Sequence, residues 1–435
     1  MGSWQKRGGV VQVMAAVLLF AGVGVLSVHA EEAASTESLS ELLVALTREV
    51  SLLEDDLLAV QNRQQPGELA PEQVRDIIES SISWFREAQE ENGHFRYEYH
   101  PYSNEYTSDD HVVRQAGALY ALGGILRRDR EDPYGVSAVI DRGIDFMKGR
   151  TIEGTHEDQS FSCILGIAGG QTCFTAAAAL TLISLIDRVE ASQTPRSDHL
   201  SLIRAYRNNL VAMQLPSGGY RNYYYSHRDT QSDGESSFTN GEVLLALVRY
   251  AAYDPNDTEV TELIARTLAY LTRGRETYDF GLYLWAMAAI KELSSTDYLP
   301  QSARLWAEGY TTWRIDSFAS RRWSQHNMCA YVEGLASARS FALFENDADE
   351  LIRLDNEINH WLNRSRHLQV LDRDTIRLIR SEDDTVLAHL KIPSRAYGGF
   401  LTGRNELTQR IDFTQHCMSS YVQDLVDLRG QKIAP

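Results

Sequence analysis

The chain is poor in positive charge, in proline and in cysteine, and these shortages exclude several classes of protein. Lys and Arg number 42 against 60 Asp and Glu, so the formal net charge is −18. Because contact with phosphates needs clustered basic residues, this balance argues against a nucleic-acid partner. With only 10 Pro and 29 Gly among 435 residues, the chain is neither collagen-like nor of low complexity. It contains no phosphate loop, nucleotide fingerprint or nucleophile elbow, and we predict no cofactor.

The first 30 residues have the pattern of an export signal. Lys6 and Arg7 precede an apolar run from Val10 to Val28, and a small-x-small cleavage site ends at Ala30. This run is also near the length that spans a bilayer, so an uncleaved membrane anchor is the alternative. No later segment resembles a membrane span. We therefore expect an exported, soluble protein, periplasmic or extracellular.

Residues 31–67 separate the signal from the main domain. Their apolar residues alternate at spacings of four and three, as in a heptad seam: Leu39, Leu43, Leu46, Val50, Leu53, Leu57 and Val60. This seam over residues 39–60 predicts either a short coiled coil that makes a homo-oligomer or an amphipathic helix on the domain surface. Gln64-Gln65-Pro66-Gly67 then reads as a linker.

From residue 68 to 435 the chain alternates two kinds of helical segment. One kind is amphipathic: 71–90, 134–149, 197–213, 257–273, 299–314 and 347–363. The other kind is apolar or small on nearly all sides and therefore buried: 111–126, 173–187, 239–253, 280–293, 327–343 and 415–428. Six buried helices, each preceded by a covering helix, predict an all-α (α/α)6 toroid. An open helical array is the alternative.

The links that lead into the buried helices are long, at 91–110, 150–172, 214–238 and 364–414. They open at the end of the ring where the buried helices begin, which makes this end the predicted working face. Alternating apolar residues at 375–379 and 385–390 flank Glu382-Asp383-Asp384, a pattern that predicts a small β-hairpin insertion.

Two motifs resemble known toroidal families. Gln89-x-x-x-Gly93-x-Phe95 and Gln214-x-x-x-Gly218-x-Tyr220 resemble the turn of terpenoid cyclases and related α/α toroids. The stretches 236–241 (SSFTNG) and 412–416 (DFTQH) are similar to the S-S-F-x-x-N-G and D-Y-x-T-x-H stretches of glucuronyl C5-epimerases. Both resemblances imply a toroid of the six-hairpin superfamily, and neither implies one reaction.

Acidic and histidine side chains on the working face are the candidate catalytic groups. Glycoside cleavage needs two carboxylates on opposite sides of the scissile bond, whereas a lyase or epimerase needs a base such as His. We single out Asp110 with Asp233 or Glu235 as an acid pair across the mouth, although capping of helices is the alternative role for any one acid. The full set is Asp110, His111, Asp233, Glu235, Glu242, His326, Asp412 and His416.

Aromatic and arginine side chains crowd the same loops and are the candidate substrate-binding groups. Sugar rings stack on aromatic faces, and Arg forks bind carboxylates such as uronates, although loop packing and pairing with neighbouring acids are the alternatives. The set is Tyr97, Tyr99, Arg114, Tyr220, Tyr224, Arg322, Trp323, Tyr397 and Arg410.

Four cysteines allow two disulfides in three pairings. Between adjacent buried helices we favour Cys329–Cys417, which leaves Cys163–Cys173 as the second bridge. His326, Cys329, His416 and Cys417 do not have a strong zinc-ligand spacing, so we predict no metal.

The sequence thus predicts an exported toroid that acts on a polysaccharide or cell-envelope glycan. Hydrolysis by an acid pair at the mouth is preferred over a uronate lyase or C5-epimerase. A non-catalytic toroid that binds a glycan or a partner is the third interpretation. Membrane association is expected only if the N-terminal segment is uncleaved.

Overall fold

The computed structural model describes residues 67–156, 159–296, 298–319, 327–371, 375–381, 384–403 and 406–434. The predicted export signal and heptad seam lie outside these residues. The chain divides into two units, residues 1–64 with 380–385, and residues 65–379 with 386–435. The second unit contains every helix described below.

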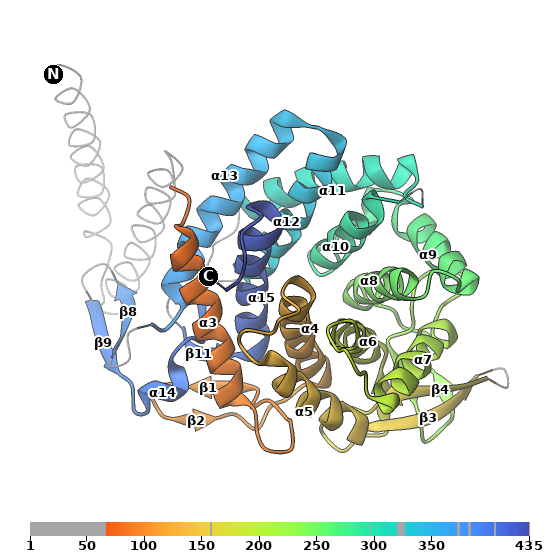
Figure 1. Ribbon diagram of the computed structural model, residues 1–435, viewed down its shortest axis with the longest axis horizontal. Helices are drawn as coiled ribbons and strands as arrows, with labels where there is room; N and C mark the ends of the chain where they lie inside the picture. The colour runs from red at the N-terminus through yellow and green to blue at the C-terminus, as the bar shows by residue number, and fades with distance from the viewer. Residues whose placement is uncertain are drawn as a thin grey trace, which may run out of the picture. The chain divides into compact units, whose positions relative to one another are not determined.

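Helices of the second unit form two concentric layers (Figure 1). The outer layer consists of α3 (Pro71–Ala88), α5 (Val136–Gly149), α7 (Ser197–Ala212), α9 (Thr258–Leu271), α11 (Gln301–Ala319) and α13 (Ala348–Ser365). The inner layer consists of α4 (Val112–Arg128), α6 (Thr175–Glu190), α8 (Ser237–Tyr253), α10 (Tyr283–Ser294), α12 (Met328–Glu345) and α15 (Ile411–Val422), which continues as the π-helix η3 (Gln423–Leu428). The predicted alternation of covering and buried helices is confirmed.

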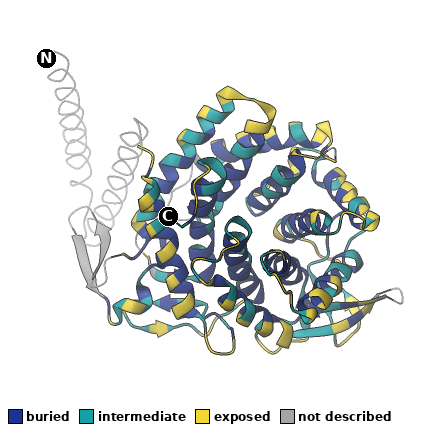
Figure 2. Ribbon diagram, in the orientation of Figure 1, coloured by how far each residue is buried: buried dark blue, intermediate teal, exposed yellow. Residues whose placement is uncertain are grey.

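The inner helices close into a ring. In contact order they run α4, α6, α8, α10, α12 and α15, and α15 returns to pack against α4. Each outer helix packs on the inner ring (Figure 2). In α3 the buried residues Val74, Ile77, Ile78, Ile82 and Phe85 follow the spacing of one helical stripe, as expected for a covering helix. The prediction of an (α/α)6 toroid is confirmed, and the open array is excluded.

The Gln-x-x-x-Gly-x-aromatic motif is a structural turn that follows an outer helix. Gln89 and Phe95 form an isolated β-bridge, and the Gln89 side-chain amide donates to the carbonyl oxygens of Gly93 (3.1 Å) and Val139 (2.9 Å). Gly93 has φ of +89°, and a Cβ there would lie 2.0 Å from the carbonyl oxygen of Arg142 in α5. The turn therefore joins one helix pair to the next.

A third copy of this turn is interrupted in the sequence. Gln369 pairs with Phe400 as Gln89 does with Phe95, and Gly398 between them has φ of +90° and packs on the backbone of Ser80 in α3. This contact ties the last helix pair to the first. The interruption carries the strands β8 (Thr375–Ser381) and β9 (Asp384–His389), which pair as the predicted hairpin.

The long links also contain strands that the sequence patterns do not predict. One sheet has the order β10 (Leu401–Gly403), β11 (Glu406–Arg410), β1 (Glu98–His100) and β2 (Glu105–Tyr106). Another has the order β5 (Thr172–Phe174), β6 (Tyr223–Tyr225) and β7 (Thr230–Gln231), and β3 (Thr151–His156) pairs with β4 (Gln159–Ile164). Most of these strands are too short to show an alternating pattern, and two of the pairings, β1 with β11 and β5 with β6, join different links.

Both predicted disulfides are present. Cys329 of α12 is bonded to Cys417 of α15, and Cys163 of β4 to Cys173 of β5. None of the helices among the described residues combines the length and the apolar character needed to cross a bilayer.

Candidate active site in the ring lumen

A buried carboxyl group without a partner lies near the start of α8. Glu242 is 2% exposed, and its Oε2 atom has no hydrogen-bond partner among the described residues. Burial raises the pKa of Glu242 to about 8, and the positive charge of Arg114 on α4 offsets only part of this shift. At neutral pH this group is therefore a carboxylic acid, able to donate a proton.

A second carboxyl group holds a histidine across two neighbouring helices. Oε2 of Glu333 on α12 lies 2.8 Å from Nδ1 of His416 on α15, and both residues are buried. The other carboxylate oxygen, Oε1, has no hydrogen-bond partner in the described part of the chain. The Cys329–Cys417 bridge joins the same two helices, next to His416. Glu333 thereby orients the imidazole ring, as a carboxylate does for a catalytic base.

Aromatic rings connect this pair to other helices of the ring. The ring of Trp285 on α10 lies 6.0 Å from that of His416 and 5.2 Å from that of Tyr120 on α4. A Cβ atom on Gly241 would lie 2.7 Å from Cβ of Trp285, so glycine beside Glu242 permits this close packing. Side chains of α4, α10, α12 and α15 are thus in contact with one another, and the backbone of α8 packs on α10 beside Glu242.

A charged cluster lies where α15 begins. Asp412 is 5% exposed and binds Arg410 through two hydrogen bonds of 3.0 and 2.5 Å, while Nε of Arg114 lies 3.4 Å from the same carboxylate. The Arg410 guanidinium stacks over the ring of Tyr97 at 5.3 Å. Burial raises the pKa of Tyr97, and the charge of Asp412 adds to this effect. These four residues, all predicted site residues, therefore form one cluster.

Asp110 is held by its immediate surroundings. Its carboxylate contacts Nε2 of His94 and accepts from the backbone N–H of His111 (2.6 Å) and the side-chain amide of Gln115 (2.9 Å). Burial alone lowers the pKa of His94, but its hydrogen bonds with Asp110 and Glu90 outweigh burial and raise it. Glu90, His94 and Asp110 line a cleft of about 570 Å³ between the first long link, α5 and the second long link.

His111, predicted as a candidate catalytic group, caps a helix in the structure. Its Nδ1 atom accepts from the backbone N–H of Val113 at 3.3 Å, at the start of α4. Its ring packs on Phe174 at 5.0 Å. Burial lowers the pKa of His111, and the charge of Arg114 lowers it further.

The two acids before α8 differ in their surroundings, and only Glu235 contacts an outer helix. Glu235 accepts from the hydroxyl of Tyr270 on α9 (2.5 Å) and from the side-chain amide of Asn240 (3.3 Å), while Asp233 is exposed in the loop. Asp110 belongs to the start of α4, which α6 separates from α8 in the ring. The contacts of Asp110 and Glu235 therefore do not bring them together as an acid pair, and such a pair stays a prediction.

Three predicted substrate-binding tyrosines are buried in structural contacts. Tyr99 is 1% exposed and donates to Asn104, Tyr220 is 0% exposed beside Thr267 of α9, and Tyr224 is 4% exposed and donates to Asp229. The ring of Tyr99 packs on that of Tyr106, the ring of Tyr224 packs on that of Phe161, and Tyr220 lies against α9, so all three have little exposed surface. Tyr397 is half-buried at the end of α14 (Pro393–Ala396).

Three predicted site residues, Arg322, Trp323 and His326, lie outside the described residues. Conversely, the predicted set lacks Glu333, Trp285 and Tyr120. The available signal for Glu333 was a charged residue in the otherwise apolar first half of a buried helix, where Val332 and Gly334 flank it. Its pairing with His416 depends on which helices are neighbours in the ring.

One group of side chains in the described part of the chain has metal-ligand spacing. Ligand atoms of Asp145, Asp198 and His199 lie within 4.8 Å of one another. Both carboxylates bind the guanidinium of Arg196, and Asp198 also binds Lys148 at 2.9 Å. These ion pairs account for the cluster, and we assign no metal to it.

The chain matches no known family by its sequence profile, and no curated protein matches it by sequence. Its fold matches solved structures over most of both chains. A sugar epimerase from a ruminal bacterium has a TM-score of 0.55 and 13% identity, covering 82% of this chain and 98% of the epimerase. D-mannose isomerase has a TM-score of 0.55 and 11% identity, covering 81% of this chain and 96% of the isomerase. The GH76 α-mannanase BT2949 of Bacteroides thetaiotaomicron has a TM-score of 0.55 and 9% identity, covering 82% of this chain and 96% of the mannanase. The chain therefore has the six-hairpin toroid fold, as predicted.

Proposed function

We propose that the protein is a carbohydrate-active enzyme that epimerises or isomerises a sugar by proton transfer in the ring lumen. The observation that carries this proposal is the buried, unpartnered carboxyl of Glu242, whose raised pKa keeps it protonated at neutral pH. It lies near the start of an inner helix, as Glu333 and His416 do. One acid and one oriented base are the groups that such a reaction needs.

In the proposed reaction His416 removes the proton from a sugar carbon next to a carbonyl or carboxylate group. Glu333 orients the ring through Nδ1 and stabilises the imidazolium that forms. Glu242 donates its proton, or a hydrogen bond, to the oxygen on which negative charge develops. In an isomerisation, the His416 imidazolium returns its proton to the neighbouring carbon, and the Glu242 carboxylate takes a proton back from the adjacent hydroxyl group. In an epimerisation, water delivers a proton to the opposite face of the same carbon, Glu242 takes its proton back from the oxygen, and His416 releases its proton to solvent.

The charged cluster at the start of α15 is the proposed substrate-binding end of the lumen. Arg114 is 35% exposed in its side chain, and Tyr97 is half-buried, so both present surface to a ligand. Their proposed partners are sugar hydroxyls or a uronate carboxylate. Trp285 offers an aromatic ring beside His416 for stacking.

The fold matches support the substrate class. The similar structures act, by their names, on sugars as epimerases and isomerases or as mannanases. Action on a glycan and export from the cell both remain parts of the proposal. The two disulfides support export because such bridges persist in oxidising compartments.

Hydrolysis is the second candidate, favoured by the mannanase match and by the number of carboxyl groups. Glu242 would be the general acid and Glu333 the carboxylate base, or the rim acids Asp110, Asp233, Glu235 and Asp412 would supply the pair. We place hydrolysis second because Asp110, Glu235 and Asp412 are each engaged by other side chains. In addition, the oriented base in the lumen is a histidine.

Incubation of the protein with neutral and uronate-containing oligosaccharides in D2O, followed by NMR, tests the proposal. We expect an epimer or ketose that carries deuterium at the reacting carbon, without new reducing ends. New reducing ends would instead indicate hydrolysis, and unsaturated uronate products would indicate a lyase. Binding of these sugars without any turnover would favour the non-catalytic toroid.

A further inference from the structure

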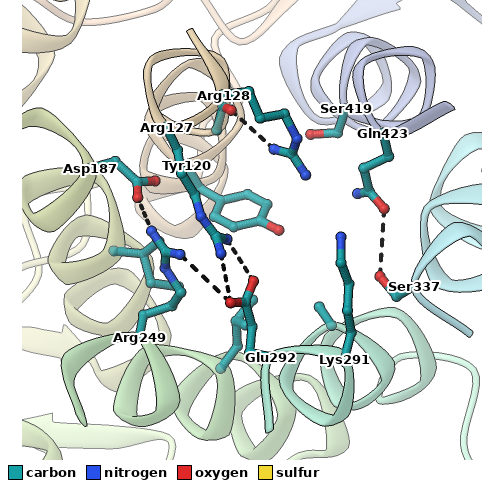
Figure 3. Close-up of a pocket in the computed structure, with 14 residues that line it drawn as sticks. Tyr120, Arg127, Arg128, Asp187, Arg249, Lys291, Glu292, Ser337, Ser419 and Gln423 are labelled. Atoms are coloured by element: carbon teal, nitrogen blue, oxygen red, sulfur yellow. Dashed lines mark hydrogen bonds and ion pairs between the residues drawn. The ribbon is translucent and has the colours of Figure 1, made fainter. Parts of the chain in front are cut away.

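The far end of the lumen holds a second cluster of charged side chains, apart from the candidate active site. A cavity of about 40 Å³ lies there, and all six inner helices line it. Figure 3 shows the side chains of Tyr120, Lys291 and Gln423 pointing toward its centre. By the usual measure, in which one water needs roughly 10–15 Å³, the space holds about three water-sized groups.

Ion pairs surround this cavity but leave one positive charge in excess. Four cations, Arg127, Arg128, Arg249 and Lys291, stand against three carboxylates, Asp187, Glu292 and Asp427. Arg127 binds both oxygens of Glu292 at 2.6 Å, and Arg128 binds those of Asp427 at 2.7 and 2.6 Å. Lys291 shares Asp427 with Arg128, so one carboxylate serves two cations.

The lining also contains a buried donor without an acceptor. Arg249 is 7% exposed and binds Asp187, but its Nε–H has no hydrogen-bond partner among the described residues. A buried donor and an uncompensated buried charge both cost free energy unless a ligand satisfies them.

Carbonyl groups at the ends of some inner helices lie near the cavity and offset part of this positive charge. α12 continues eight residues beyond Ser337 to Glu345, and α8 continues four residues beyond Arg249 to Tyr253. Since the effect of a helix dipole falls off within about the last turn, the end of α12 lies beyond the cavity. In contrast, α4, α6 and α10 end within one turn of the lining residues Arg128, Asp187 and Lys291, and their carbonyl groups place partial negative charge there. The guanidinium of Arg128 also donates a hydrogen bond to the carbonyl oxygen of Gly124 at 3.0 Å.

We propose that this cavity is a binding site for one small monovalent anion of the size of chloride. The anion balances the excess cation, and Arg249, Lys291 and the polar side chains of the lining coordinate it. The limited volume excludes sugars and nucleotides. The site lies beside the ring of Tyr120, which packs on Trp285 of the candidate active site. The inference does not depend on the proposed function.

Bromide is the probe that tests this site directly. Crystals of the wild-type protein grown in sodium bromide should show one anomalous peak inside the cavity. A cavity without such a peak, in crystals that show bromide elsewhere, would overturn the proposal.

Thermal unfolding tests it in solution, with sodium chloride replacing sodium gluconate at constant ionic strength. We expect Tm of the wild-type protein to rise with chloride and to saturate. In Lys291→Met the half-saturating chloride concentration should increase by about tenfold or more, the equivalent of one lost charge contact. Asp427 keeps its bidentate contact with Arg128 in this variant, so the fold is expected to persist.

Two further variants complete the experiment. Ala288→Leu fills the cavity without changing charge and should also abolish the chloride response. Lys148→Met removes an exposed ion pair with Asp198 on the outer layer and should leave the response unchanged. An equal response to chloride in all four proteins would contradict the proposal, because it would mark a general salt effect.

Discussion

Both ends of the ring lumen contain buried carboxyl groups, but only at one end are these groups bound by arginines. Where the inner helices begin, Glu242 and Glu333 are buried, and each has a carboxylate oxygen without a partner. Toward their other ends, Glu292 and Asp427 are bound by arginines through bidentate pairs. Accordingly, burial raises the pKa of Glu242, whereas the pKa of Asp427 is lowered because the charges of Arg128 and Lys291 outweigh burial.

This difference separates chemistry from stability within one ring. Unsatisfied groups cost stability and are retained where a substrate uses them, whereas paired groups stabilise the helices that carry them. The comparison assigns function to the first end and support to the second. Four experiments can break or sharpen this assignment.

Removal of the proposed base should have the largest effect. We expect His416→Asn and Glu242→Gln each to lower kcat/KM by about 10²–10⁴-fold, since each removes a proton-transfer group. Circular dichroism should show an intact fold. The matched control is Asp110→Asn, which alters an acid of the first long link, in a cleft that Tyr97 also lines, and removes no proton-transfer group of the proposed reaction. Equal losses in all three variants would remove the distinction between the lumen and the rim.

Loss of a paired carboxylate at the other end should affect stability. Asp427→Asn leaves Arg128 and Lys291 without their carboxylate, and we expect it to lower the free energy of unfolding by about 3–5 kcal/mol. The control Asp198→Asn breaks an exposed pair and should cost about 1 kcal/mol or less. Urea denaturation measures both. Similar values would show that the charge network contributes no more than a surface pair.

The two disulfides should differ in what their removal does. Cys329 and Cys417 close a loop of 88 residues, so the double Ala variant should lose about 4.6 kcal/mol, against about 2.7 kcal/mol for the 10-residue loop of Cys163 and Cys173. Only the first change should also lower activity, because it frees the helices of Glu333 and His416. Stability and kcat/KM measured under reducing and non-reducing conditions test both statements.

The pH dependence of stability should reveal Glu242. Between the ordinary value of 4.5 and about 8, the native protein binds one proton more than the unfolded chain. Stability therefore falls as pH rises through this window, by about 1.4 kcal/mol per unit at most. Glu242→Gln should abolish this contribution, so the urea concentration at the unfolding midpoint should change less with pH between pH 5 and 8. Parallel curves for the two proteins would show that Glu242 titrates normally.

The ring itself was predictable from sequence because its signals are local. Runs such as Thr175 to Ile186 are apolar or small on every side, whereas Pro71 to Ala88 has one apolar stripe, and each pattern fixes the layer of its helix. Strands such as Glu98–His100 were not predictable, because their partner β11 lies about 300 residues away. Cys329–Cys417 followed from the layer of the two helices, and the structure adds that they are neighbours.

The candidate site was only partly predictable. Glu242, His416, Arg114 and Asp412 are conspicuous in sequence as polar groups at the starts of buried helices. Whether such a group is free or engaged depends on residues far along the chain, as with Glu235 and Tyr270, or Glu333 and His416. Likewise, the sequence does not show that Tyr99, Tyr220 and Tyr224 are buried.

By itself, then, the sequence determined the class of fold, the two layers and the end of the ring that carries the long links. It did so because amphipathicity and helix capping act over a few residues. Only the tertiary structure decided which carboxyl groups are paired and which are left unpaired in the lumen. The physical reason is that the protonation state of a buried carboxyl depends on its neighbours across the ring, and closure of the ring chooses those neighbours.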